Sequence, residues 1–136
     1  MEQRALCLDT SMLIAFLRNQ EPGATAVVNA VQWYNCGVTA VTSYELLFGA
    51  RRSKKEIGES ALLGNMTVWP FNDNASKAAA QLHADLIGSN NDIGVKDVLI
   101  AATCLVHSLP ILTLNDRHFA RVPGLVVYTP ATLPSV

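Results

Sequence analysis

Four acidic residues stand at positions from which their carboxylates could meet: Asp9, Glu45, Asp97 and Asp116. The other seven of the eleven acidic residues fall on predicted surface helices, loops or termini, and we interpret them as solvated charge. Carboxylate oxygens are the ligands that Mg²⁺ and Mn²⁺ prefer. Like charges in a partly buried cleft repel by on the order of several kcal/mol, so such a group needs protons, Arg or Lys partners, or a bound cation. We interpret the four residues as a divalent metal site.

Three of these acids also have simpler structural interpretations. Asp9 could cap the helix that is predicted to follow it. Glu45 stands three residues after Thr42, which matches the capping-box pattern, although Thr42 can cap the helix while Glu45 faces a cleft. Asp97 could be a first-turn acid that the helix dipole favours. The metal interpretation therefore depends on the joint placement of the acids rather than on any one of them.

The fourth position is open to two neighbouring residues, Asp116 and Asn115. Asp116 is preferred because it brings a negative charge to the cation. It has a simpler interpretation as a turn residue. Asn115 stands directly before it and remains the alternative.

The acids can meet only if the chain brings them to one edge of a sheet. Short apolar runs predict strands, and apolar residues at a spacing of three and four predict helices between them. The predicted strands span residues 4–8, 37–41, 66–69, 110–113 and 125–128; the predicted helices span 11–18, 24–32, 54–63, 73–87 and 95–107, one more begins at Thr42, and a turn or short helix covers 115–120. Continuously apolar strands that alternate with helices are typical of a parallel sheet covered on both faces. We expect an α/β fold of three layers with about five parallel strands, forming a single domain over residues 1–136.

This fold would bring the four acids to one edge of the sheet. Asp9 ends the first strand, Glu45 lies in the first turn after the second strand, and Asp116 follows the fourth strand. Asp97 begins the helix that leads into the fourth strand, so the start of that helix lies at the same edge. Open α/β sheets bind their ligands at the carboxyl ends of the strands. The sequence therefore predicts the metal site at this edge.

Composition limits the class of protein. Half of the 136 residues are hydrophobic and 15% are charged, which excludes a disordered chain. No apolar run reaches the roughly 18 residues of a membrane span, and the N-terminus has no signal-peptide pattern, so we expect a soluble cytoplasmic protein. The net charge of −1 counts against a polyanionic partner unless a local basic patch or a metal offsets it. The odd number of cysteines, Cys7, Cys36 and Cys104, indicates buried thiols rather than disulfides.

Four motifs in order make the chain resemble the PIN-domain family, specifically its VapC-type toxin ribonucleases. The motifs lie at residues 8–11 (LDTS), 42–49 (TSYELLFG), 97–102 (DVLIAA) and 112–119 (LTLNDRHF), the last followed by VPGL at 122–125. Any one of them is weak, but four in order over nearly the whole chain are specific. The last motif departs from the pattern because its acid position here reads Asn115-Asp116, which leaves the fourth ligand in question.

The resemblance implies a PIN fold and RNA cleavage that depends on Mg²⁺ or Mn²⁺. Asp9 and Asp97 would then hold the metal with help from Asp116, and Glu45 would orient or deprotonate the attacking water or bind a second ion. Further hydrogen bonds to these ligands are expected from Thr10, Ser11, Thr113 and Asn115. The resemblance also implies a homodimer and a cognate antitoxin that inhibits the enzyme.

A basic run could contact RNA phosphates or an acidic segment of the antitoxin. It comprises Arg51, Arg52, Lys54 and Lys55, and Arg117 lies nearer to the predicted site. The alternative is solvated charge on a helix surface. His118 is interpreted as a turn residue.

Two other functions use parts of the same pattern. A phosphotransfer enzyme or receiver domain also places an Asp at the end of a strand, but a haloacid-dehalogenase-like enzyme would need a second Asp at Ser11, and a receiver would need a Lys near Asn115. A non-catalytic PIN-like module could bind RNA or protein without cutting, but it would not need the complete set of acids.

Overall fold

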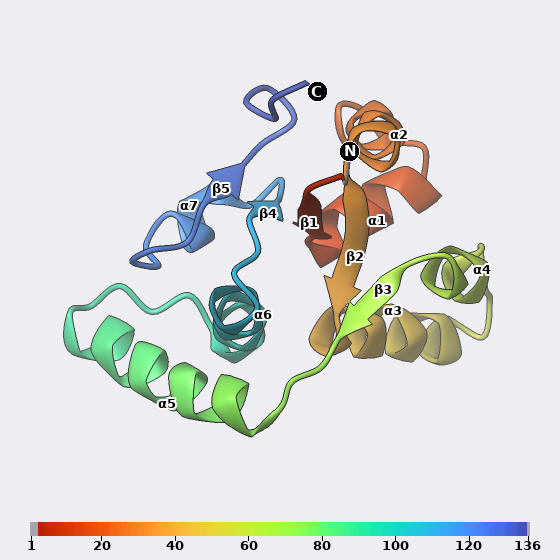
Figure 1. The fold of residues 1–136 in the computed structure, drawn as a ribbon. Helices are drawn as coiled ribbons and strands as arrows, with labels where there is room; N and C mark the ends of the chain where they lie inside the picture. The colour runs from red at the N-terminus through yellow and green to blue at the C-terminus, as the bar shows by residue number, and fades with distance from the viewer. Residues whose placement is uncertain (1–2, 136) are drawn as a thin grey trace.

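A five-stranded parallel sheet forms the centre of the computed structural model, which describes residues 3–135 (Figure 1). The strands lie in the order β3-β2-β1-β4-β5, so the first strand occupies the middle of the sheet. Their bounds are β1 Ala5–Leu8, β2 Asn35–Thr39, β3 Thr67–Trp69, β4 Ile111–Leu112 and β5 Val127–Tyr128. All neighbouring pairs are parallel, with Cys7 aligned with Gly37 on one side and with Ile111 on the other. This confirms the predicted α/β fold.

Helices connect the strands and cover both faces of the sheet. Their bounds are α1 Thr10–Leu17, α2 Gly23–Trp33, α3 Ala40–Ser53, α4 Glu59–Gly64, α5 Asp73–Gly88, α6 Val95–Val106 and α7 Asp116–Phe119. The alternating side chains of β1 divide the core into two. Leu6 and Leu8 pack with residues of α1, α2, α3 and α4, whereas Cys7 packs with residues of α5, α6 and α7. The molecule therefore has three layers.

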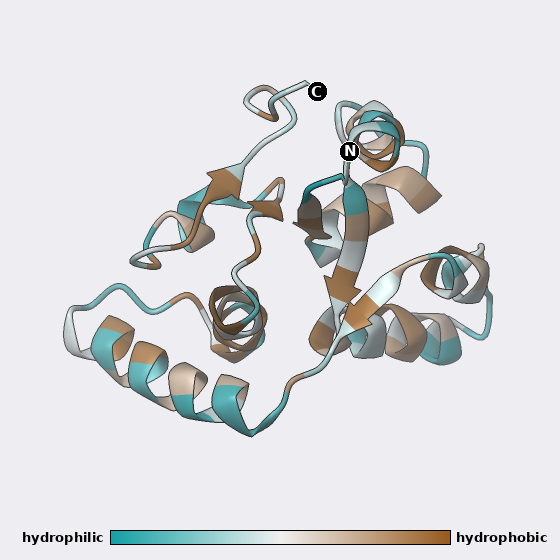
Figure 2. Ribbon diagram, in the orientation of Figure 1, coloured by the Kyte–Doolittle hydropathy of each residue, from teal (hydrophilic) through white to brown (hydrophobic). Residues whose placement is uncertain are grey.

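The helix α6 lies between the sheet and α5. Figure 2 shows α6 as mainly hydrophobic and α5 as hydrophobic along one side only, which fits an inner and an outer helix. Val98, Ile100 and Ala101 of α6 are fully buried. This packing fixes α6, and with it the position of Asp97 in its first turn.

The strand order reverses beside β1. From β1 the chain passes to β2 and β3 on one side, and it then returns to β4 on the other side. The connections that leave the carboxyl ends of β1 and β4 therefore run in opposite directions. Such a point is where open α/β sheets bind ligands, and Asp9 follows β1 at this point.

Several predicted element boundaries were wrong, and the backbone explains two of them. The second strand ends at Thr39 rather than at residue 41, and α3 begins at Ala40 because the Thr39 side chain accepts a hydrogen bond from the Thr42 backbone N–H at 3.2 Å. The helix predicted over 54–63 begins only at Glu59, since Lys54 ends α3 in a left-handed conformation (φ 55°). A residue with this φ cannot continue or open a right-handed helix.

All three cysteines are free thiols, as predicted, but only two of them are buried. Cys7 and Cys104 are buried, and Cys36 is half-buried. Burial raises the pKa of the Cys36 thiol to about 12, so it is protonated at neutral pH. No helix within residues 3–135 is long and apolar enough to span a membrane.

Candidate active site

Asp9 lies directly after the carboxyl end of β1, and its backbone N–H donates to the Leu112 carbonyl of β4 at 3.0 Å. It is 4% exposed, and its Oδ2 accepts hydrogen bonds from the hydroxyls of Ser11 and Thr113, both at 2.8 Å. It occupies the N-cap position of α1, but its side chain makes no capping hydrogen bond. The capping interpretation of Asp9 therefore does not describe its contacts, which hold the carboxylate against β4 instead.

The environment of Asp9 disfavours its negative charge. Burial raises the pKa of its carboxyl, the hydrogen bonds from Ser11 and Thr113 lower it, and the charge of Asp97 raises it further; the net shift of the pKa is upward. No Arg or Lys forms an ion pair with Asp9 in the part of the chain that the structure describes. A cation bound here would stabilise the ionised form.

Glu45 lies on α3, and its carboxylate contacts α1 at Thr10, the residue after Asp9. Its Oε1 accepts a hydrogen bond from the Thr10 hydroxyl at 2.9 Å, and its Oε2 lies 3.7 Å from Nζ of Lys96. Its side chain is 20% exposed and that of Lys96 is 60% exposed, so this ion pair stands at the mouth of the site. Screening by water keeps such a pair weak and leaves Lys96 free to turn to another anion.

A chain of buried threonine hydroxyls leads to the Glu45 carboxylate. The Thr10 and Thr42 hydroxyls are 2.9 Å apart, and Thr39 Oγ1 lies 3.5 Å from Thr42 Oγ1. Thr10 donates to a carboxylate, which only accepts, so Thr42 must donate to Thr10. Thr39, rather than Thr42, caps α3, so the capping-box interpretation of Glu45 was wrong.

Asp97 stands in the first turn of α6 with its side chain 22% exposed. Its Oδ2 lies 2.8 Å from Nδ1 of His118 and 3.3 Å from the amide nitrogen of Asn115. Oδ1 takes no hydrogen bond from residues 3–135. The Asn115 backbone N–H in turn donates to Thr113 Oγ1 at 2.8 Å, which connects the neighbourhoods of Asp97 and Asp9.

The structure favours Asn115 over Asp116 for the fourth position. Asn115 contacts Asp97, whereas Asp116 is exposed in the first turn of α7 and its side chain makes no hydrogen bond or ion pair with the described residues. No hydrogen bond therefore connects Asp116 to the residues around Asp9 and Asp97 in the part of the chain that the structure describes. The reason is local: the backbone reverses at Asn115, and adjacent residues at a helix start point in different directions.

Sequence reasoning missed several residues that contact the acids. His118 was interpreted as a turn residue, and Lys96, Thr39 and Thr42 were given no role at the site. A usable signal for His118 was its spacing of three from Asn115, which places two polar side chains on one side of a helical turn. Lys96 offers no comparable signal, because its partner Glu45 is remote in sequence.

The chemistry of these side chains fits Mg²⁺ or Mn²⁺. Asp9 and Asp97 provide oxygen ligands, their charges repel each other, and Asp9 has no cationic partner among the described residues. Within that part of the chain, no group of three or more His, Cys, Asp or Glu side chains is arranged to hold a metal ion. Mg²⁺ does not require three such side chains, since it usually keeps several waters and contacts one or two carboxylates. An open site of this kind leaves room for a phosphate group.

Glu59 was predicted to be solvated, and it is buried. It is 7% exposed, and its Oε1 accepts the Ile57 backbone N–H at 2.6 Å. That hydrogen bond holds the loop before α4 and gives Glu59 a structural role.

The basic residues all lie at the surface. Arg51 and Arg52 occupy the last turn of α3, where cations are favoured by the helix dipole. Lys54, Lys55 and Arg117 are exposed as well. None of the five forms an ion pair with an acid within residues 3–135.

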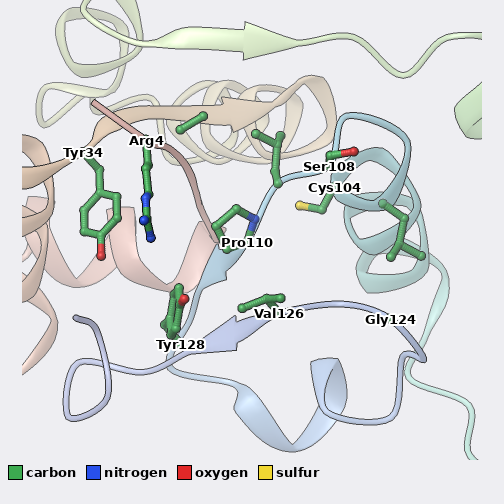
Figure 3. Close-up of a pocket in the computed structure, with 11 residues that line it drawn as sticks. Arg4, Tyr34, Cys104, Ser108, Pro110, Gly124, Val126 and Tyr128 are labelled. Atoms are coloured by element: carbon green, nitrogen blue, oxygen red, sulfur yellow. The ribbon is translucent and has the colours of Figure 1, made fainter. Parts of the chain in front are cut away.

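A pocket of about 590 Å³ lies at the opposite edge of the sheet (Figure 3). Arg4, Tyr34 and Tyr128 line it together with Cys104 and Val126, and no carboxylate does. It is therefore separate from the acidic site at the carboxyl ends of the strands.

Known proteins resemble this chain over most of its length. The model of the family described as PIN domain matches residues 6–125. Ribonuclease VapC of Rickettsia bellii is 32% identical over 134 residues, which cover 91% of this chain and 95% of that protein. A tRNA(fMet)-specific endonuclease VapC of Shigella flexneri is 29% identical, with 87% and 92% covered.

Solved structures show the same fold. VapBC-5 of Mycobacterium tuberculosis, a member of the VapBC family of toxin–antitoxin systems, matches with a TM-score of 0.66 at 26% identity over 92% of this chain and 96% of that chain. DNA-bound VapBC of Salmonella typhimurium matches with a TM-score of 0.80 at 23% identity, with 93% and 98% covered. The residues 6–125 that match the family model include all the acids of the site.

Proposed function

The chain belongs to the PIN domain family, and from this we propose that it is an endoribonuclease that uses Mg²⁺ or Mn²⁺ and acts as the toxin of a type II toxin–antitoxin pair. The relatives named ribonuclease VapC support the reaction, and the similar structures of VapBC complexes support the antitoxin. The observation that carries the proposal is the buried Asp9 carboxylate, which has Asp97 as a charged neighbour and no cationic partner among the described residues.

Each acid has a role in the proposed cleavage. Asp9 and Asp97 would hold the ion, with Asn115 rather than Asp116 beside them. When bound, the ion makes a water more acidic and offsets the negative charge that develops on the phosphate oxygens. Glu45 orients the attacking water or accepts its proton, and the Thr10 hydroxyl fixes the direction of the Glu45 carboxylate.

RNA cleavage by the purified protein tests this function. A tRNA is the first substrate to try, because one relative is named as a tRNA(fMet)-specific endonuclease. We expect cleavage with Mg²⁺ or Mn²⁺, none in excess EDTA, and a loss of at least about 100-fold in Asp9→Asn and in Asp97→Asn. Asp116→Asn is the matched control and should retain activity. Full activity of either Asp9→Asn or Asp97→Asn, or cleavage in EDTA, contradicts the assignment.

We further propose two protein partners, a second copy of the chain and a cognate antitoxin. The protein forms a homodimer, which sedimentation velocity measures, and its antitoxin masks the acidic site. Arg51, Arg52, Lys54, Lys55 and Arg117 are accessible to RNA phosphates or to an acidic segment of the antitoxin. We propose that residues 3–135, which the structure describes, act as one domain and that the protein acts in the cytoplasm.

A further inference from the structure

Three side chains form a hydrogen-bonded cluster at the edge of the acidic site. Nδ1 of His118 lies 2.8 Å from Oδ2 of Asp97, and the Asn115 amide nitrogen lies 3.3 Å from the same oxygen. The Asn115 amide nitrogen also lies 2.8 Å from Nδ1 of His118, but an amide nitrogen only donates, so this contact is not a hydrogen bond when Nδ1 donates its own proton to Asp97. The cluster holds one oxygen of Asp97 from two directions.

The chemistry of the carboxylate determines which ring nitrogen of His118 carries a proton. A carboxylate only accepts hydrogen bonds, so the 2.8 Å contact requires a proton on Nδ1. Both donors fall on Oδ2 of Asp97, while Oδ1 takes no hydrogen bond from residues 3–135. The carboxylate therefore has one oxygen fixed to the protein and one oxygen available to a ligand.

Asp97 depends on these contacts more than Asp9 does. Asp9 is almost fully buried and is held by two hydroxyls, whereas the Asp97 side chain is 22% exposed at the start of a helix. Without His118 and Asn115, the described residues offer the Asp97 side chain no other hydrogen bond. Its carboxylate would then rotate between several staggered conformers.

The turn from β4 into α7 connects the two metal-binding acids. Thr113 donates to Asp9 and accepts the Asn115 backbone N–H, and the next two polar side chains of the turn, Asn115 and His118, contact Asp97. Phe119 is fully buried beside His118 and anchors the turn in the core. The same short segment thus sets the position of both carboxylates.

We propose that His118 and Asn115 are positioning residues that orient Asp97 so that its Oδ1 faces the metal ion. The proposal rests on the metal site of the proposed function, and it assigns His118 a role in metal affinity rather than in the chemical step. Removing a hydrogen-bond partner of a metal ligand typically weakens the metal affinity by about 10- to 100-fold.

Calorimetric titration of the full chain with MnCl₂, without RNA, tests the proposal. We expect His118→Ala to weaken Mn²⁺ binding by about 10- to 100-fold. His118→Asn should restore most of the affinity, because its amide nitrogen takes the place of Nδ1, whereas His118→Gln places its amide nitrogen where Nε2 was and should not. His107→Ala is the matched control, since the hydrogen bond of the His107 ring within residues 3–135 is to the Pro70 carbonyl and not to an acid of the site.

A second measurement separates positioning from direct catalysis. The cleavage rate of His118→Ala should need more Mn²⁺ to reach its maximum, and the maximal rate should return to within about threefold of that of the unmodified protein. Thermal unfolding in EDTA checks that His118→Ala and Asn115→Ala are folded. Asn115→Ala should weaken Mn²⁺ binding in the same direction as His118→Ala.

Four outcomes overturn the proposal: unchanged Mn²⁺ affinity in folded His118→Ala, equal weakening in His118→Ala and His118→Asn, a cleavage rate that stays low at saturating Mn²⁺, or no Mn²⁺ binding by the unmodified protein. Equal weakening in His118→Ala and His118→Asn would indicate that the His118 imidazole itself binds the ion. If the unmodified protein binds Mn²⁺ and the variants behave as expected but no RNA is cut, the proposed function fails and the positioning role stands.

Discussion

Asp9 is a buried carboxylate whose partners are hydroxyl groups rather than cations. Ser11 and Thr113 both donate to its Oδ2, and these two hydrogen bonds offset only part of the penalty for burying the charge, so the net effect on the pKa is upward. Asp97, with a more exposed side chain, adds repulsion. Without a bound ion, the ionised Asp9 carboxylate therefore destabilises the folded protein.

This destabilisation predicts how the stability of the metal-free protein depends on pH. Because the folded pKa of Asp9 is raised, the stability that Asp9 contributes is complete below the ordinary Asp pKa of about 3.9 and is lost as the pH rises through the folded pKa. Asp9→Asn has no carboxyl group to ionise, so it does not lose this stability as the pH rises. In EDTA at pH 8, we expect Asp9→Asn to unfold at a higher temperature than the unmodified protein, and the difference should shrink as the pH falls toward 4.

Mn²⁺ should make the unmodified protein unfold at a higher temperature than Asp9→Asn. The ion stabilises the unmodified protein by binding its folded form, whereas Asp9→Asn lacks a ligand and gains little. Thermal unfolding with and without MnCl₂ measures both effects. An Asp9→Asn variant that is less stable than the unmodified protein at pH 8 in EDTA would contradict the destabilisation by the Asp9 charge.

The start of α3 is the element that delivers Glu45 to the site. Thr39 ends β2 and caps α3 by accepting the Thr42 backbone N–H, and its hydroxyl also begins the chain that leads through Thr42 and Thr10 to Glu45. Nearby, Gly37 of β2 leaves room for β3, because a Cβ there would lie 2.5 Å from the Thr67 carbonyl oxygen. The geometry of Glu45 is thus set by the strand-to-helix junction.

Removing the cap should weaken the fold measurably. Thr39→Ala is expected to lower the free energy of unfolding by about 1 kcal/mol, because the Thr42 backbone N–H loses its acceptor in a fully buried position. Thr39→Ser keeps the oxygen and should retain most of that stability. Urea denaturation of the three proteins measures the difference. Equal stability of Thr39→Ala and the unmodified protein would rule out Thr39 as the cap.

At the scale of the whole molecule, charge is distributed unevenly. The net charge is only −1, yet Lys96 stands beside Glu45 at the mouth of the site, and the end of α3 carries Arg51 and Arg52. Binding to RNA depends on local cations that replace counterions rather than on the total charge. Within residues 3–135, Lys96 is the lysine that forms an ion pair with an acid of the site, so a phosphate in the site would be its alternative partner.

Lys96→Ala should therefore weaken RNA binding without unfolding the protein. In the background of the inactive Asp9→Asn variant, we expect the slope of log affinity against log salt concentration to fall by about 1. Lys77→Ala is the matched control, because Lys77 is equally a surface lysine but pairs with Asp73 on α5. Fluorescence anisotropy over a range of KCl concentrations measures the slope. An unchanged slope in the Lys96→Ala protein would remove Lys96 from the RNA contact.

Most of the architecture could be predicted from local patterns. The apolar runs around Leu6–Leu8 and Ile111–Leu112 and the helical spacing of α5 are encoded by neighbouring residues, so the order of elements and the parallel sheet followed from them. Connectivity then placed Asp9, Glu45 and Asp97 at one edge. Boundaries were less predictable, because the Thr39 cap and the left-handed Lys54 depend on backbone torsions that composition does not report.

The direction of each polar side chain depended on contacts between distant parts of the chain. Thr113 reaches Asp9 across 104 positions, and Asn115 and His118 reach Asp97 across 18 and 21. The residue types and their order were enough to predict an acidic site in this fold, because helix and strand periodicity are local properties. The choice of Asn115 over Asp116, and the role of His118, needed the folded molecule, because packing of Phe119 in the core determines which way that turn faces.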